Sequence, residues 1–457
     1  MKKDIVLKKE LGLFMATALV AGNMIGSGIL MLPASLASIS GPGSTILAWI
    51  FTGLGSIFLA LSFARLGTKI PKTGGPYEYS KLAFGGFVGF MNAWLYWTAS
   101  WIGNAAIITS IASYTGSLFP IVKTNGTVAF LYTSLILWIF TILNIKGVRL
   151  AGIFQSFTTI FKLVLFIFFI CISAWHFDIA NITPMFPVNA GIETLPAAAA
   201  ITLWAFSGFE TSTINAGEIK NPERNIKLST VLGISITVIL YLLISVTAMG
   251  AMSQDGLKAS AAPIIDIMAQ YLGIGITKII LVAAIVSVFG SAVGWILTTA
   301  RMSYAAGKDN IFPKVFGRVH PKYNTPHMSL IINTVLTNVL LFMNYSGSLL
   351  SAFNFMVLLS ALAYLPVYAC TTLADILFLY KEEGSFNKAK FIKSSVVPLI
   401  GLGYSIWAIC GSGKEVILYG CLLMLLGVPF YLYSKIKNKY KDETNLKVCK
   451  ETEEQVI

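Results

Sequence analysis

The chain has 457 residues, of which 56% are hydrophobic and 12% are charged, and its mean hydropathy is +0.76. A soluble globular domain carries roughly twice this share of charged residues, so the composition excludes one. The formal net charge of +13 would suit a nucleic-acid-binding protein, but the basic residues follow the loops of a membrane protein, which excludes a nucleic-acid partner.

Apolar runs recur along the chain. A helix needs about 20 apolar residues to cross a bilayer, and about twelve runs qualify: 11–38, 44–67, 84–117, 127–145, 151–175, 195–217, 228–252, 274–304, 327–344, 350–379, 392–411 and 415–434. The first run is too long, and too bare of an A-x-A cleavage pattern, for a removable signal peptide. We therefore expect an all-α membrane protein with one polytopic transmembrane domain over residues 1–434 and a solvated, mobile tail over 435–457.

Lysine and arginine residues gather in alternate loops. If the N-terminus and every second loop are assigned to the cytoplasm, 28 of the 33 basic residues lie on that side, and Lys162 lies within a run. Cytoplasmic loops carry such an excess of basic residues. We expect both termini in the cytoplasm.

The first run contains the stretch GNMIGSGILMLP, residues 22–33. A glycine in a helix interior costs about 1 kcal/mol relative to alanine, so Gly26 and Gly28 on either side of Ser27 predict a break. Ser207 and Gly208 interrupt the sixth run in the same way.

These breaks lie five runs apart, as they would if helices 1 to 5 and 6 to 10 were inverted repeats, over about 11–175 and 195–379, with extra helices over 392–434. Matching interrupted helices point to the binding site of a secondary transporter. The physical reason is that unwound backbone at membrane depth is tolerated only where it is buried in protein or lines a cavity.

The GSG segment has two interpretations. A half-helix that begins after it would direct N–H groups and the positive end of its dipole toward an anion, such as a substrate carboxylate. Close helix packing by small residues is the alternative. The second break, at Ser207 and Gly208, favours the binding site.

Glu210 is the carboxylate, and Lys162 the cation, that we find well inside a run. A charged side chain there costs at least about 2.5 kcal/mol, which makes both functional candidates. Glu210 is expected to be a gate or coupling residue, or else a structural carboxylate bonded to neighbouring helices. Lys162 either carries a proton or is a fixed cation that holds the broken helices together where another carrier binds sodium. We expect no second buried acid.

Tyr96, Trp204 and Trp295 stand apart from the other aromatic residues, most of which we expect at interfaces or in the core. An indole face in a dehydrated cavity holds a cation by about 2 kcal/mol, with ordinary packing as the alternative. Asn104 follows Tyr96 by eight residues, about two helical turns. Both are therefore expected to reach one cavity.

The cysteine and histidine residues of the sequence do not form a pattern typical of a metal site or of an enzyme active site. The five cysteines are scattered without a CxxC pair, and His176, His320 and His327 fall in loops. The sequence therefore predicts no metal, no cofactor and no enzyme active site, and it offers no charge rings for a channel pore.

Five stretches carry a family resemblance: GNMIGSGILMLPASLA, GGPYEYSKLAFG, LYWTASWIGN, TLWAFSGFETSTINAGEIKNPERNI and GSGKEVILYG. From about Leu11 to Tyr433 the chain resembles the amino acid–polyamine–organocation (APC) transporters, and among them the basic amino acid and polyamine antiporters, most of all the bacterial arginine/agmatine branch. The resemblance implies a LeuT-type 5+5 inverted-repeat fold in a bacterial inner membrane, commonly as a homodimer, with a small-molecule amino acid or amine as substrate.

The resemblance also implies how the amino acid head binds. Its carboxylate would meet Ser27 and Gly28, and its α-amino group would meet backbone carbonyls near Met24, Trp204 and Ser207. Trp204 would close over the substrate from the periplasmic side.

For the distal group, the resemblance implies that a guanidinium or amine lies against Trp295, with Ser100 and Asn104 nearby. Tyr96 and Glu210 would belong to a pH-responsive inward gate. The full set of expected substrate contacts is Asn23, Met24, Gly26, Ser27, Gly28, Tyr96, Ser100, Asn104, Trp204, Ser207 and Trp295, with Glu210, Lys162 and Tyr96 for gating or proton coupling.

Two positions depart from the arginine/agmatine branch. Lys162 resembles the proton-coupled, broad-specificity carriers of the superfamily instead, and Val367, after Pro366, stands where that branch has a gating tyrosine, with Tyr368 adjacent. Two functions therefore stay open. One is exchange of a cationic amino acid for its amine or another amino acid by alternating access, and the other is proton-coupled amino acid symport.

Overall fold

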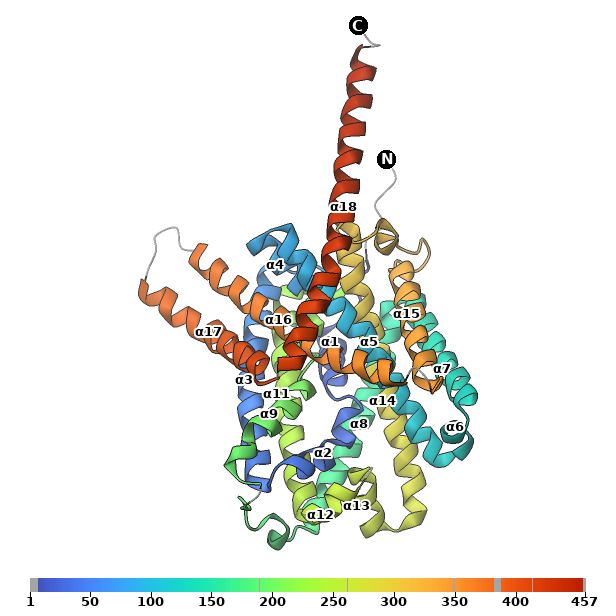
Figure 1. The fold of residues 1–457 in the computed structure, drawn as a ribbon, viewed down its shortest axis with the longest axis vertical. Helices are drawn as coiled ribbons and strands as arrows, with labels where there is room; N and C mark the ends of the chain where they lie inside the picture. The colour runs from blue at the N-terminus through green and yellow to red at the C-terminus, as the bar shows by residue number, and fades with distance from the viewer. Residues whose placement is uncertain are drawn as a thin grey trace.

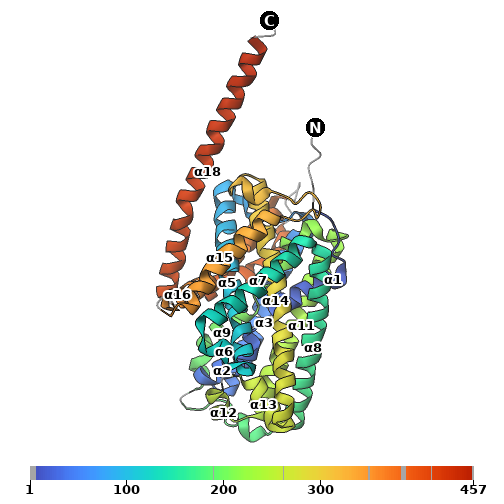
Figure 2. The same ribbon diagram turned by 90° about the vertical axis from the view of Figure 1, so that its right-hand side faces the viewer.

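The computed structural model describes residues 7–454 apart from 189, 261, 348, 349, 382–387 and 413. Over these ranges the regular structure is helical, apart from an isolated bridge between Leu11 and Ile219. The helices form one bundle, from which α18 projects (Figures 1 and 2). The expected all-α membrane fold is confirmed.

Long uninterrupted helices make up most of the bundle, and nine of them in the described part are long and apolar enough to cross a membrane. Helix α5 is equally long and turns polar side chains such as Asn92 and Ser100 into the interior. The long helices are α3 (Pro42–Lys69), α5 (Gly86–Leu118), α7 (Gly126–Lys146), α8 (Val148–Trp175), α11 (Pro222–Ala251), α14 (Ile274–Lys308), α15 (His327–Tyr345), α16 (Leu350–Lys381), α17 (Lys388–Gly411) and α18 (Lys414–Glu454).

Short helices mark the two ends of the bundle (Figure 1). Helix α4 (Pro76–Phe84) lies at one end, which we call the α4 end, and α12 (Gln254–Ala259) and α13 (Pro263–Leu272) lie at the other, the α13 end. Other short segments outside the two broken helices are α6 (Pro120–Thr124), η2 (Ile179–Ile182), η3 (Ile192–Thr194) and η5 (Lys314–Gly317).

The first apolar run is a broken helix. Helix α1 (Leu13–Met24) ends in the middle of the bundle, and the chain continues as a 3₁₀ turn, η1 (Gly28–Leu30), and then as α2 (Leu32–Ile39). Residues 25–27 between them are not helical. The break predicted from the glycines is confirmed.

The sixth run is broken as well. Helix α9 (Leu195–Ala205) gives way to a turn over 206–210, and α10 (Thr211–Ile214) and η4 (Ala216–Glu218) follow. Gly208 in the turn has a φ of +113°, and a Cβ there would lie 3.1 Å from the backbone nitrogen of Met24. The two breaks therefore touch, and glycine is what permits the contact.

Residues 435–454, in the expected solvated tail, are helical. Helix α18 continues through Glu454 and extends beyond the α4 end of the bundle (Figures 1 and 2). The physical reason is that no glycine or proline follows Pro429 in this helix, so nothing in the local sequence interrupts it.

We predict that Gly208→Ala lowers the stability of the protein. Holding a residue with a Cβ at this φ costs about 1–3 kcal/mol, and the new methyl group would press on Met24. Gly403→Ala is the matched control, because Gly403 is exposed on α17 and a Cβ there meets nothing within 4 Å. Thermal unfolding in detergent should show a fall for the first variant and none for the second; equal midpoints would contradict the close contact.

Candidate functional site

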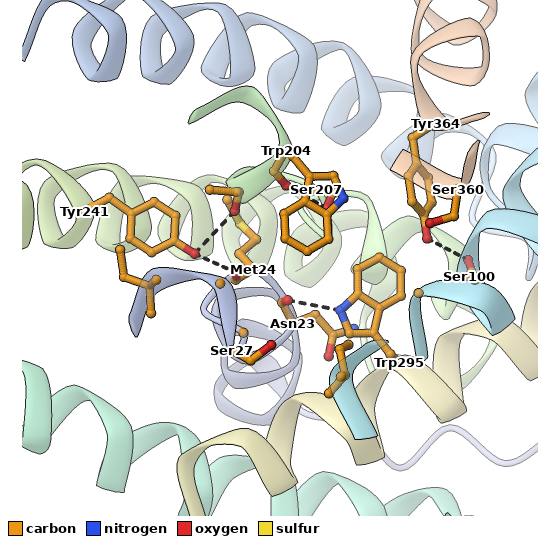
Figure 3. Close-up of a pocket in the computed structure, with 16 residues that line it drawn as sticks. Asn23, Met24, Ser27, Ser100, Trp204, Ser207, Tyr241, Trp295, Ser360 and Tyr364 are labelled. Atoms are coloured by element: carbon orange, nitrogen blue, oxygen red, sulfur yellow. Dashed lines mark hydrogen bonds between the residues drawn. The ribbon is translucent and has the colours of Figure 1, made fainter. Parts of the chain in front are cut away.

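A cavity lies where the two broken helices meet (Figure 3). Side chains and backbone from α1, η1, α5, α9, α11, α14 and α16 converge on it. Its lining residues are Asn23, Met24, Gly26, Ser27, Gly28, Ile29, Ser100, Gly103, Ile107, Trp204, Ala205, Ser207, Tyr241, Trp295, Ser360 and Tyr364.

Helix α5 contributes Ser100, Gly103 and Ile107 to the cavity wall. Tyr96 and Asn104, which we expected to reach the cavity together, lie outside its lining. The Tyr96 hydroxyl donates to Glu210 Oε1 (2.9 Å), and Asn104 Nδ2 donates to Thr299 Oγ1 (3.3 Å). A substrate contact for either residue stays a prediction.

Trp295 forms one side of the cavity, and contacts with Asn23 and Tyr364 fix its side chain. Its indole N–H donates to the carbonyl of Asn23 (3.1 Å), and its ring lies 5.9 Å from that of Tyr364 between centroids. Tyr364 donates in turn to Ser100 Oγ (3.1 Å). The indole face of Trp295 is thus fixed in orientation beside the cavity.

Tyr241 on α11 joins the two breaks, and sequence reasoning did not find it. Its hydroxyl donates to the carbonyl of Met24 (2.6 Å), the last residue of α1, and lies 3.3 Å from the carbonyl of Ala205, the last residue of α9 (Figure 3). Nothing in the sequence distinguishes this tyrosine from the other 17.

The cavity is more open toward the α13 end than toward the α4 end. The side chain of Trp204, on the α13 side, is 38% exposed, and it packs over Gly28, where a Cβ would come within 3.2 Å of the indole. On the α4 side Glu210 is fully buried beneath Tyr96. Phe209 fills the space beside it, with Phe63 and Tyr368 at centroid distances of 5.2 and 5.0 Å.

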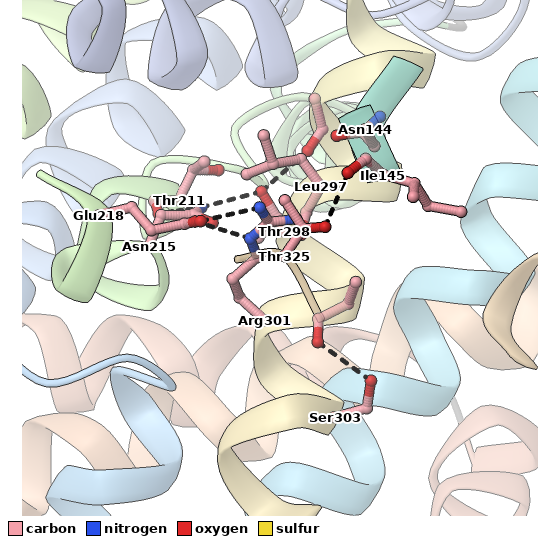
Figure 4. A network of polar contacts seen from close by, with 12 residues as sticks. Asn144, Ile145, Thr211, Asn215, Glu218, Leu297, Thr298, Arg301, Ser303 and Thr325 are labelled. Carbon is pink, nitrogen blue, oxygen red and sulfur yellow. Dashed lines mark hydrogen bonds and ion pairs between the residues drawn. The ribbon is translucent and has the colours of Figure 1, made fainter. Parts of the chain in front are cut away.

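A polar network lies on the α4 side of the cavity, and Figure 4 shows the part of it around Thr211, Asn215 and Thr298. Asn23 Nδ2 donates to Thr211 Oγ1 (3.1 Å) and lies 3.3 Å from Thr298 Oγ1, which also accepts from Asn215 (3.2 Å). This network links α1, α10 and α14 on the α4 side of the cavity.

The expectation of a single buried acid is wrong. Glu218 is fully buried and forms a bidentate pair with Arg301, at 2.7 and 2.9 Å (Figure 4), and Asp375 is buried in a bidentate pair with Arg65. Both pairs lie toward the α4 end. Arg301 lies near the end of the apolar run 274–304, and α14 continues past it through Lys308.

Glu218 also holds the segment before α1. Its backbone carbonyl accepts from the N–H groups of Glu10 and Leu11 (2.9 Å each), and Lys220 N–H donates to the carbonyl of Leu11 (2.8 Å). The side chain of Glu218 thus binds α14, while its backbone carbonyl binds residues 10 and 11 just before α1.

Lys162 lies beside the first break and does not line the cavity. Its ammonium is fully buried and donates to the carbonyls of Gly22 (3.1 Å) and Ile25 (2.6 Å) and to Ser291 Oγ (2.8 Å). These carbonyls lie at the C-terminal end of α1, where the helix dipole favours a cation.

A mid-bundle cavity at two helix breaks, sealed on one side and more open on the other, defines a secondary transporter. Comparison of the sequence with known protein families gives the same class of protein. The sequence profile of the amino acid permease family matches residues 11–432, so the chain belongs to that family.

Several relatives align over almost the whole chain. The chain is 31% identical to a putative arginine/ornithine antiporter of Bacillus subtilis, with 95% of this chain and 98% of the relative covered. It is 30% identical to an arginine/agmatine antiporter of Chlamydia pneumoniae (94% and 91% covered) and 31% identical to the putrescine transporter PotE of Haemophilus influenzae (94% and 98% covered).

We predict strong coupling between Glu218 and Arg301. Removing one partner of a buried ion pair leaves an unpaired charge and costs about 3–5 kcal/mol. Glu218→Gln and Arg301→Met should therefore each lower the unfolding midpoint, and the double variant should lose much less than the sum of the two. Additive losses in thermal unfolding would mean that the pair does not act as a unit.

Proposed function

We propose that this protein exchanges a cationic, arginine-like amino acid for its amine or for another amino acid, by alternating access. The observation that carries the proposal is a cavity at two helix breaks with indoles at Trp204 and Trp295, where no described lining residue bears a carboxylate or an amine. The names of the aligned antiporters and of the putrescine transporter support the same substrate class.

In this proposal the two ends of the substrate bind to different groups. The carboxylate meets backbone N–H groups at the start of η1, around Ser27 and Gly28, which a helix leaves free. The distal cation lies against Trp295, where a cation–π contact contributes about 2 kcal/mol.

The neutral lining explains how one site can serve both partners of an exchange. A cation–π contact can hold a singly or a doubly charged substrate, whereas a carboxylate in the cavity would favour one and slow its release. Glu218 does not change this argument, because Arg301 neutralises it and neither residue lines the cavity.

The size of the cavity requires that side chains move during transport. Its volume is about 50 Å³, which accommodates only a few water molecules. Arginine, with about 12 non-hydrogen atoms, is the size of a small drug fragment and does not fit into this volume. Trp204, at the more exposed side, is the side chain that we propose moves aside for entry and then covers the substrate.

Counterflow in proteoliposomes tests the exchange. Labelled arginine should enter vesicles loaded with unlabelled arginine, agmatine, ornithine or lysine, and should not enter vesicles without an internal substrate. Equal uptake into loaded and empty vesicles would rule out exchange, and binding without any uptake would indicate a solute sensor.

We predict that Trp295→Leu raises the KM for arginine by about 30-fold, the equivalent of a lost 2 kcal/mol contact, while Trp295→Phe raises it less because an aromatic face remains. Trp175→Phe is the matched control, since Trp175 is 86% exposed and far from the cavity lining. The measurement is the initial rate of exchange over a range of arginine concentrations. A Leu variant with an unchanged KM would remove Trp295 from the proposed site.

Proton-coupled symport is the second candidate, and the buried ammonium of Lys162 is the observation that favours it. Symport would produce uptake into empty vesicles under an inward pH gradient, lost in Lys162→Ala. We favour the fixed-cation role, because three acceptors already surround the ammonium and two of them are carbonyls at the end of α1.

For a fixed cation we predict that Lys162→Met lowers the unfolding midpoint, because each lost hydrogen bond to a charged group contributes about 1.5–3 kcal/mol. Exchange should fall together with stability, and a pH gradient should drive no uptake in the wild type. Gradient-driven uptake that disappears in a stably folded Lys162→Met protein would establish the proton-carrying role instead.

We also propose a place and topology for the protein: the bacterial cytoplasmic membrane, with the α4 end and both termini in the cytoplasm, as a carrier without catalytic activity and as a homodimer. The excess of lysine and arginine in alternate loops supports this orientation. Protease cleavage of the tail in inside-out but not in right-side-out vesicles would check it.

A further inference from the structure

Lys81 on α4 places its ammonium in a small group of acidic and aromatic side chains at the α4 end. The ammonium contacts the carboxylate of Asp309, lies 3.9 Å from Glu78 Oε1 and lies over the ring of Tyr77, 5.4 Å from its centroid. The Tyr77 hydroxyl donates to the same oxygen of Asp309 (2.7 Å). An anion, a second acid and an aromatic face are the groups that recognise a primary ammonium ion.

Lys81, Glu78 and Asp309 form one wall of a cavity of about 300 Å³, and Tyr77 does not line it. The cavity is separate from the one between the helix breaks, and Lys72, Lys308 and Gly217 also line it. Neither Lys72 nor Lys308 has a salt-bridge partner among the described residues. The cavity thus has an ammonium-binding wall and two lysines that form no ion pair with a described residue, although the charge of Lys72 acts on Glu78.

The protonation of the two acids fits this arrangement. Burial raises the pKa of Glu78, whereas hydrogen bonds from Lys81 and Tyr77 outweigh the burial of Asp309 and lower the pKa of that carboxyl. Asp309, whose ionised form these hydrogen bonds favour, is also the carboxylate that contacts the Lys81 ammonium.

We propose that this cavity is a second binding site for an amino acid, in which the ligand ammonium replaces that of Lys81 on Asp309 and Tyr77 and the ligand carboxylate binds Lys72 and Lys308. Lys81 is a tethered stand-in for the ligand amine. The proposal goes beyond exchange at the central cavity and does not depend on it.

The proposed second site lies between two elements that close the α4 side of the carrier. Gly217 belongs to η4 and Lys308 to α14, the two elements that the Glu218–Arg301 pair joins. A ligand held between them would therefore contact both elements that close the α4 side of the central cavity.

The test removes the stand-in and supplies the amine from solution. We expect that n-butylamine, which has the length of a lysine side chain, raises the unfolding midpoint of purified Lys81→Ala protein by roughly 2 °C or more. 6-Aminohexanoate should raise it further because it adds a carboxylate, and hexanoate should have no effect. The wild type should respond weakly, because tethered Lys81 competes at an effective concentration in the millimolar range.

Control variants separate this site from others. Lys278→Ala, which removes an exposed lysine at the far end of α14, should respond like the wild type. Lys81→Ala/Asp309→Asn should lose the response to both amines, and Lys81→Ala/Lys308→Ala should keep the response to n-butylamine but lose the preference for 6-aminohexanoate. If Lys81→Ala does not fold, Lys81→Gln replaces it in each comparison.

A response in Lys81→Ala no larger than in the wild type, or one that persists after Asp309→Asn, would overturn the proposal. A response to n-butylamine without any preference for 6-aminohexanoate would overturn the amino acid as the ligand. Unfolding midpoints do not require transport, so a failure of arginine exchange would leave these outcomes unchanged.

Discussion

The structure depends on how the carbonyl groups freed at the end of α1 find donors inside a dry bundle. An unpaired polar group at membrane depth costs several kcal/mol. The carbonyl of Met24 accepts from Tyr241, that of Asn23 from Trp295, and those of Gly22 and Ile25 from Lys162 and Ser291. Donors from α8, α11 and α14 thus hold the break open, and the cavity exists because the backbone cannot close into a continuous helix there.

The same arrangement separates charge from the substrate cavity. Lys162 binds carbonyls at the end of α1, and the Glu218–Arg301 pair lies on the α4 side of the polar network of Asn23, Thr211 and Thr298. A substrate cation between the two breaks therefore faces ring systems and backbone dipoles. In our proposal this is what lets one cavity accept and release cations of different charge.

The broken helices could be predicted from the sequence because glycines in two apolar runs are a local signal, and the structure has both breaks. Tyr96 and Asn104 lie about 80° apart around α5. Neither is in the described cavity lining, because the Tyr96 hydroxyl donates to Glu210 and the Asn104 amide donates to Thr299. Ser100, Gly103 and Ile107 form the cavity wall instead. Tyr241 and Arg301 were missed for another reason: their roles depend on partners more than 30 and more than 80 residues away in the chain, Ala205 and Glu218, which no local pattern reveals.

The backbone hydrogen bonds between Glu218 and residues 10 and 11 also affect how the two broken helices can move. Because Leu11 exchanges backbone hydrogen bonds with the segment after the second break, the inner parts of both interrupted helices are fastened into one rigid unit. Any opening of the α4 end would then swing the two half-helices together rather than one at a time, and a fusion or truncation close to Leu11 would disturb the pivot of that motion.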